Sequence, residues 1–129
     1  MVKVQKLGHI AIRVKDIARA KSFYTDLGMN LIWEDDDWCY LEANDDRNGL
    51  ALLGPGYKAA GPHFAFHFHD RHEVDLVHKR LKASGVHVGA IHDHRDGTAS
   101  FYLKDPEGNL LEMLYEPPGG VPNNQLERK

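Results

Sequence analysis

Polar and apolar side chains alternate along two segments of the chain, which predicts two β-strands of similar character. In residues 7–16 (LGHIAIRVKD), isoleucine and valine fall on one face, and histidine, alanine and arginine fall on the other. In residues 61–70 (GPHFAFHFHD), phenylalanines alternate with histidine and alanine in the same way. Because successive side chains of a strand point to opposite faces, each segment has one apolar face and one face that carries histidine.

The two segments also match each other, which indicates an internal repeat. Histidine, alanine and aspartate coincide when His63 is placed over His9. Each strand is followed by an aspartate that can cap a helix and by a glycine that can close it (Asp16 and Gly28; Asp70 and Gly85). Three strand-like stretches follow each helix, at 29–34, 37–43 and 49–53 and at 86–92, 98–104 and 109–115. The repeat unit is therefore predicted to be βαβββ.

The predicted fold class is α+β, with two βαβββ units over about 5–54 and 61–116 that form curved mixed sheets. A linker rich in Pro, Gly and Ala joins the units at 54–62, and the segment from 117 onward is expected to be an irregular tail. Because 129 residues are too few for two independent domains of ordinary size, we expect a single domain over 1–129.

Three side chains of the predicted sheets have the chemistry of metal ligands. His9 and His63 are equivalent in the repeat, so a pseudo-twofold arrangement would bring their polar faces together. Glu112 lies between Leu110 and Leu114 on one strand face, where a carboxylate is costly unless it is paired, hydrogen-bonded or metal-bound. Two imidazoles and a carboxylate suit divalent iron, manganese, nickel or zinc. We therefore predict that the sheets enclose one divalent metal ion on His9, His63 and Glu112.

The other histidines and the lone cysteine have plainer interpretations, because a single histidine on a strand is more often a core or surface residue than a ligand. His67 and His69 follow His63 on its strand and are expected either to line the pocket or to face solvent. Surface positions are expected for His72, His78 and His87, and turn positions for His92 and His94. Cys39 is expected to be a packing residue.

Composition and charge favour a small-molecule partner. The net charge is -3 with acidic and basic residues interspersed, so we expect neither nucleic acid nor a membrane surface as a partner. No apolar run is long enough to cross a bilayer, and the N-terminus lacks the apolar core of a secretory signal. Cys39 cannot form an intramolecular disulfide, which agrees with a reducing compartment. A cytoplasmic protein is therefore expected.

Four motifs in this order, GHIAIRVKD, KSFYTDLGM, HFAFHFHD and DPEGNLLE, resemble the vicinal oxygen chelate superfamily. This superfamily includes glyoxalases, bleomycin- and fosfomycin-resistance proteins and extradiol ring-cleavage dioxygenases. The resemblance covers nearly the whole chain. It implies paired βαβββ units around a metal that chelates two neighbouring oxygens, with His9, His63 and Glu112 as the ligands. The position equivalent to Glu112 in the first copy is Leu52 or, with one residue of slip, Ala51, and neither can bind metal.

This departure from the four-ligand pattern argues against glyoxalase I, whose members have a second carboxylate or similar ligand at that position. The stretch from His94 to Glu112 is similar to the extradiol signature, in which a histidine and a tyrosine hydrogen-bond the substrate and bound oxygen. That similarity implies catalytic roles for His94 and Tyr102 and iron(II) as the metal, with manganese, nickel or zinc left open. Against it, residue 92 is histidine where the signature favours a small or aliphatic residue. No histidine matches a further acid–base residue of larger dioxygenases, and Tyr102 could simply be a packing residue.

Two other function classes stay open at this stage. One is a redox-neutral metal enzyme, either a glyoxalase-like lyase, isomerase or epimerase or a fosfomycin-type thiol transferase, although no arginine follows Glu112 until Arg128. The other is a metal-free drug-binding protein of the bleomycin-resistance kind, which the complete ligand triad argues against. A homodimer is also predicted, because open sheets of this kind leave apolar strand faces to cover. Pairing of the units within one chain or between chains is left open.

Overall fold

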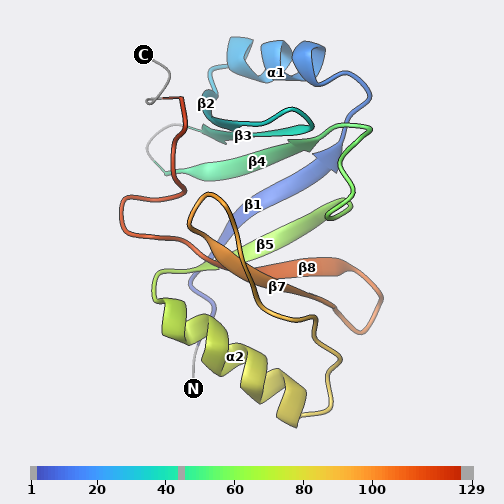
Figure 1. The fold of residues 1–129 in the computed structure, drawn as a ribbon, viewed down its shortest axis with the longest axis vertical. Coiled ribbons are helices and arrows are strands. Elements are labelled where there is room, and N and C mark those ends of the chain that lie inside the picture. The colour runs from blue at the N-terminus through green and yellow to red at the C-terminus, as the bar shows by residue number, and fades with distance from the viewer. Residues whose placement is uncertain (1–2, 44–45, 126–129) are drawn as a thin grey trace. The chain divides into compact units, whose positions relative to one another are not determined.

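The computed structural model of the protein describes residues 3–43 and 46–125 and contains two copies of the predicted unit (Figure 1). The first copy comprises β1 (Lys6–Arg13), α1 (Ile17–Asp26), β2 (Asn30–Glu34), β3 (Trp38–Ala43) and β4 (Asn48–Leu53). The second comprises β5 (His63–Phe68), α2 (Arg71–Ala83), β6 (His92–Asp93), β7 (Ala99–Lys104) and β8 (Leu110–Tyr115). The prediction of an α+β fold with two βαβββ repeats is confirmed.

The chain divides into two compact units, and each contains strands paired in both parallel and antiparallel directions. The N-terminal unit contains the described residues of Gly8–His63 together with 123–125, and its strands are ordered β2-β3-β4-β1 with β1 and β4 parallel. The C-terminal unit contains Phe64–Pro122 together with 3–7, and its strands are ordered β5-β8-β7-β6 with β5 and β8 parallel. In each unit the first and last strands of the repeat are therefore hydrogen-bonded neighbours.

A capped helix covers one face of each sheet, as the sequence predicts. Asp16 accepts a hydrogen bond from the backbone N–H of Arg19 (3.0 Å) at the start of α1, and Asp70 accepts one from that of His72 (2.9 Å) at the start of α2. In Figure 1, α1 lies against β3 and β4, and α2 lies against β7 and β8. The core of the N-terminal unit is centred on Cys39, Leu41 and Leu52. The core of the C-terminal unit is centred on Phe68, Val74, Val77, Phe101, Leu111 and Met113.

The strand predicted at 86–92 is wrong in its extent. Only His92–Asp93 forms a strand there, and an isolated bridge at Val88 precedes it. The carbonyl of Gly89 accepts a hydrogen bond from Nε2 of His78 on α2 (2.8 Å), and the backbone N–H of Gly89 donates to the carbonyl of Tyr102 on β7 (2.9 Å). His78 is therefore half-buried rather than a surface residue.

The C-terminal tail has no helix or strand in its described part, but it is anchored to the N-terminal unit. The backbone N–H of Asn124 donates to the carbonyl of Ile32 (2.9 Å), and its side-chain amide bonds both backbone groups of Glu34 (3.0 Å each). These bonds satisfy part of the open edge of β2. Residues 44–45 of the first hairpin loop, and the last four residues with Arg128, lie outside the described residues.

Two apolar side chains of β1 are about half exposed, Leu7 at 51% and Ile10 at 48%. Exposed apolar side chains on a strand are the kind of surface that a second subunit covers, and the homodimer stays a prediction. Within residues 3–43 and 46–125, neither helix has the length and apolar character needed to span a membrane.

Candidate functional site

The two faces of the C-terminal sheet differ in chemistry. Phe68, Phe101 and Met113 point toward α2 and form the core. Because side chains alternate along a strand, the residues between them point to the opposite face. We call this the polar face; it carries Ala65 and His67 from β5, Ser100 and Tyr102 from β7, and Glu112 and Leu114 from β8.

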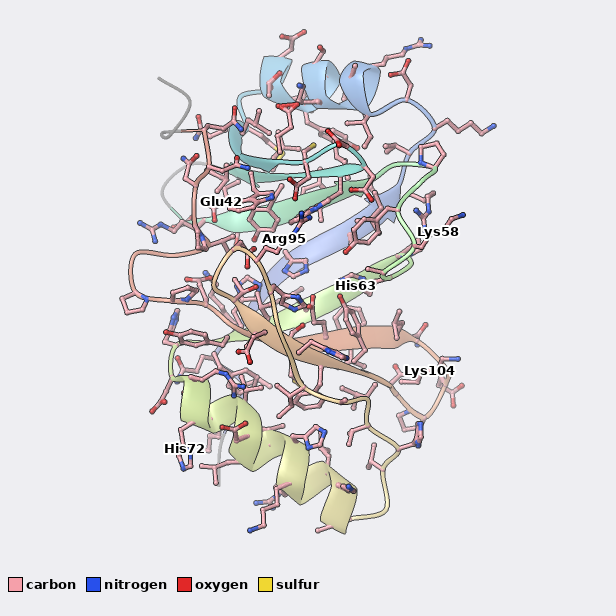
Figure 2. All side chains as sticks on the ribbon, in the orientation of Figure 1. Glu42, Lys58, His63, His72, Arg95 and Lys104 are labelled. Carbon is pink, nitrogen blue, oxygen red and sulfur yellow. The ribbon has the colours of Figure 1, made fainter. Side chains whose placement is uncertain are left out.

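Glu112 lies in the middle of this polar face and is buried, with 4% of its surface exposed. Tyr102 is directly opposite it in the β7–β8 ladder, and Ala65 is directly opposite it in the β5–β8 ladder. His63 begins β5, two residues before Ala65, as labelled in Figure 2. Strand alternation therefore places His63 on the same side of β5 as Ala65.

The imidazole rings of the two predicted histidine ligands pack edge to face in the N-terminal unit. The centroids of the His9 and His63 imidazoles are 5.5 Å apart. His9 is buried, and His63 is half-buried. Nδ1 of His63 is 2.7 Å from the carbonyl oxygen of Gly61. Because a carbonyl only accepts hydrogen bonds, Nδ1 carries the proton, and Nε2 of the neutral ring is left as an acceptor or metal ligand. Metal-binding histidines are commonly oriented by such a contact.

The strand pairing decides which residue of the first copy corresponds to Glu112. Both Ala51 and Glu112 have an alanine opposite them on the parallel side and a tyrosine on the antiparallel side (Ala11 and Tyr40; Ala65 and Tyr102). Leu52 instead belongs to the core with Cys39. Ala51 is therefore the counterpart of Glu112, and its methyl group cannot bind a metal ion.

Tyr40, Gly49 and Glu42 surround His9, and the sequence patterns did not single them out as site residues. The Tyr40 ring packs edge-on against the His9 imidazole, with centroids 5.6 Å apart. A Cβ at Gly49 would overlap the Tyr40 hydroxyl and lie 2.8 Å from Cβ of His9. Glu42 and His9 pair with Gly49 from opposite sides, so this glycine leaves room between a buried carboxylate and a candidate ligand.

The two predicted catalytic residues, Tyr102 and His94, both belong to the C-terminal unit. Tyr102 is half-buried and directly opposite Glu112. His94 is half-buried, and its Nε2 is 2.7 Å from Oγ of Ser100. Ser100 lies two residues before Tyr102 on β7, so the same strand carries Tyr102 and the hydrogen-bond partner of His94. The position of Ser100 inside the signature was the only signal for it in the sequence.

His67 is a fully buried residue paired with Glu116, rather than a solvated one. Its Nδ1 donates a hydrogen bond to Oε1 of Glu116 (2.7 Å), while Lys6 and His69 lie 3.6 and 3.8 Å from the same carboxylate. Burial raises the pKa of Glu116, but the hydrogen bond from His67 and the charges of His67, Lys6 and His69 lower it more. The net result is a pKa below the ordinary value of 4.5.

Replacing Glu116 with glutamine is expected to make the free energy of unfolding less dependent on pH in the acid range. The pKa of Glu116 is lower in the folded chain than in the unfolded chain, so its carboxylate stabilises the fold fully above the unfolded value of 4.5. This contribution is lost as pH falls through the folded pKa. E116Q should therefore unfold more easily than wild type near neutral pH and lose less stability below about pH 5.

Urea unfolding at a series of pH values measures this effect. E107Q changes an exposed glutamate on the β7–β8 loop and serves as the matched control, with a wild-type profile expected. An E116Q profile parallel to that of wild type at every pH would contradict the assignment.

His9, His63 and Glu112 are the one candidate group of metal ligands among residues 3–43 and 46–125. The donor set is two imidazoles and one carboxylate, from two buried residues and one half-buried residue. Such a set suits a divalent transition metal, and a buried carboxylate is stabilised by the positive charge of a bound ion. The residues present therefore fit the metal that the sequence predicts.

The model of the Glyoxalase/Bleomycin resistance protein/Dioxygenase superfamily matches residues 6–113. Because this is most of the chain, the protein belongs to that superfamily, as the sequence motifs indicate. It is 25% identical over 123 residues to biphenyl-2,3-diol 1,2-dioxygenase 3 of Rhodococcus globerulus, across 88% of this chain and 64% of that protein. It is 32% identical over 131 residues to the 2,2',3-trihydroxybiphenyl dioxygenase of Sphingomonas paucimobilis, across 94% and 44%.

The chain spans less than two thirds of the length of both relatives. Among solved structures, the methylmalonyl-CoA epimerase of Mycobacterium tuberculosis superposes with a TM-score of 0.72 at 21% identity. That superposition covers 100% of this chain and 97% of the epimerase. At this identity the likeness shows a shared fold and carries no statement about activity.

Proposed function

We propose that this chain is an iron(II)-dependent dioxygenase that cleaves the ring of a vicinal aromatic diol. The observation that carries the proposal is Ala51 at the position equivalent to Glu112. With Ala51 there, the ligands are two histidines and one glutamate, and this triad leaves coordination positions for a substrate. The two relatives named as dioxygenases of biphenyl-2,3-diol and trihydroxybiphenyl support the substrate class.

His9, His63 and Glu112 would hold the iron, each supported by its own surroundings. His63 is oriented through Nδ1 by the Gly61 carbonyl, and His9 is packed edge-on by Tyr40. Glu112 is buried in the middle of the polar face, where water does not compete strongly for its oxygens. Iron(II), when bound, would supply the activation of the diol and of dioxygen.

Tyr102 and His94 are proposed to bind the diol and move its protons. Tyr102 is opposite Glu112, so its hydroxyl can hydrogen-bond a substrate oxygen beside the ligand strand. His94 is half-buried in the turn between β6 and β7. Imidazoles are the usual proton-transfer groups near neutral pH. The contribution of the protein itself is therefore orientation and proton transfer.

Oxygen uptake by anaerobically purified, iron-loaded protein tests the proposal. With 2,3-dihydroxybiphenyl or catechol, we expect consumption of dioxygen and formation of a yellow ring-opened product. E112A should show neither, while E107A, which changes an exposed glutamate, should behave as wild type. Failure to take up oxygen over a broad catechol panel, with turnover of a ketone or epoxide under manganese, nickel or zinc, would replace the proposal with a redox-neutral reaction. Failure to bind any metal would favour a drug-binding protein.

A further inference from the structure

The turn that carries His94 is fixed by short hydrogen bonds. The backbone N–H of His94 donates to the carbonyl of Thr98 (2.8 Å), and that of Gly97 donates to the carbonyl of His94 (3.0 Å). Oδ1 of Asp96 accepts from both the backbone N–H and the hydroxyl of Thr98 (2.9 and 2.7 Å). Gly97 has a φ of 90°, which glycine adopts without strain. These hydrogen bonds hold the backbone of His94 in place.

The imidazole of His94 is held as well, through Ser100. The distance from Nε2 of His94 to Oγ of Ser100 is 2.7 Å, and Ser100 is 1% exposed. A buried hydroxyl that lost this partner could not replace it with water, which makes the bond costly to break. His94 and Ser100 are six residues apart in the chain. The pairing of β6 with β7 sets His92 opposite Ser100, so the intervening turn places His94 close to Ser100.

Ser100 also links His94 to β7, the strand that pairs with the strand of Glu112. Ser100 and Tyr102 share the polar face of β7, and Tyr102 is directly opposite Glu112. A change in the orientation of Ser100 would therefore alter how His94 is placed relative to the tyrosine and the carboxylate. In the proposed reaction His94 and Tyr102 act on the substrate, and Ser100 is the buried residue that contacts His94.

We propose that Ser100 is a positioning residue whose hydroxyl holds Nε2 of His94, so that His94 exchanges protons with the substrate at Nδ1. This inference rests on the proposed function, in which His94 moves a proton of the diol. An imidazole held at one nitrogen keeps a fixed orientation and reacts at the other, which is the general arrangement of an oriented base. The hydroxyl of Ser100 is 2.7 Å from Nε2 of His94, so Ser100 acts through His94.

A double-mutant cycle tests whether Ser100 acts through His94. S100A should lower kcat about 10–100-fold, as loss of a residue that orients a catalytic group commonly does, with KM and iron content close to wild type. S100T keeps the hydroxyl and should restore most of kcat. In an H94A background, S100A should cause no further loss, because the group that it positions is already missing. An equal loss in the two backgrounds would overturn the inference.

Nitrogen-15 NMR of the histidine rings gives a second measurement that needs no catalysis. In the substrate-free protein without iron, we expect His94 to show one fixed tautomer in wild type and S100T, and a mixture of tautomers in S100A. His94 signals that are the same in wild type and S100A would overturn the role of Ser100, even if the protein cleaves catechols. A tautomer change without any catechol cleavage would support the positioning contact while the dioxygenase proposal fails.

Discussion

Replacing His63 with alanine is expected to lower the affinity of the protein for iron(II) by more than about 100-fold. Loss of a residue that merely orients a metal ligand costs about 10–100-fold in affinity, and His63 is proposed as a ligand itself. Its substitution would also leave Glu112 buried without the ion that balances its charge. Equilibrium dialysis at neutral pH followed by metal analysis measures the change.

The matched control is H72A, which removes an exposed histidine from the first turn of α2 (Figure 2). H72A should keep one metal ion per chain and wild-type stability. If H63A kept stoichiometric metal after the same dialysis, the assignment of this residue as a ligand would be wrong. H9A and E112A should behave as H63A does, because each removes one of the same three ligands.

A methyl group at Gly49 is expected to weaken both the fold and the metal site. The added Cβ would overlap the Tyr40 hydroxyl and lie 2.8 Å from Cβ of His9, so at least one of these residues must move. Tyr40 is only 4% exposed, and its ring packs against the His9 imidazole, so a shift of Tyr40 is transmitted to the ligand. Overpacking of this kind costs about 1–3 kcal/mol of folding free energy.

Urea unfolding and iron(II) titration of G49A measure the two effects. G56A is the matched control, because a Cβ at Gly56 would meet nothing within 4 Å. G56A should change neither stability nor metal affinity appreciably. A G49A protein with wild-type stability and affinity would show that Tyr40 and His9 can move apart freely, and that their packing does not support the site.

Periodicity alone was enough to predict most of the architecture. Strict alternation around His9 and His63 predicted the first strand of each copy, and Asp16 and Asp70 are found as helix caps where expected. These signals work because strand alternation and helix capping depend on residues a few positions apart. The strand predicted at 86–92 was wrong in its extent, and the contact of His78 on α2 with the Gly89 carbonyl is one that local sequence does not reveal.

The sequence by itself determined the repeat, its strand faces and the chemistry of the three candidate ligands, because each of these depends on residue type and short-range spacing. Only the tertiary structure decided that Ala51 rather than Leu52 is the counterpart of Glu112. A one-residue change in register moves a side chain to the other face of a sheet, and strand pairing sets that register. Only the tertiary structure likewise joined His67 to Glu116, 49 residues away, because no local pattern specifies which buried polar groups will meet.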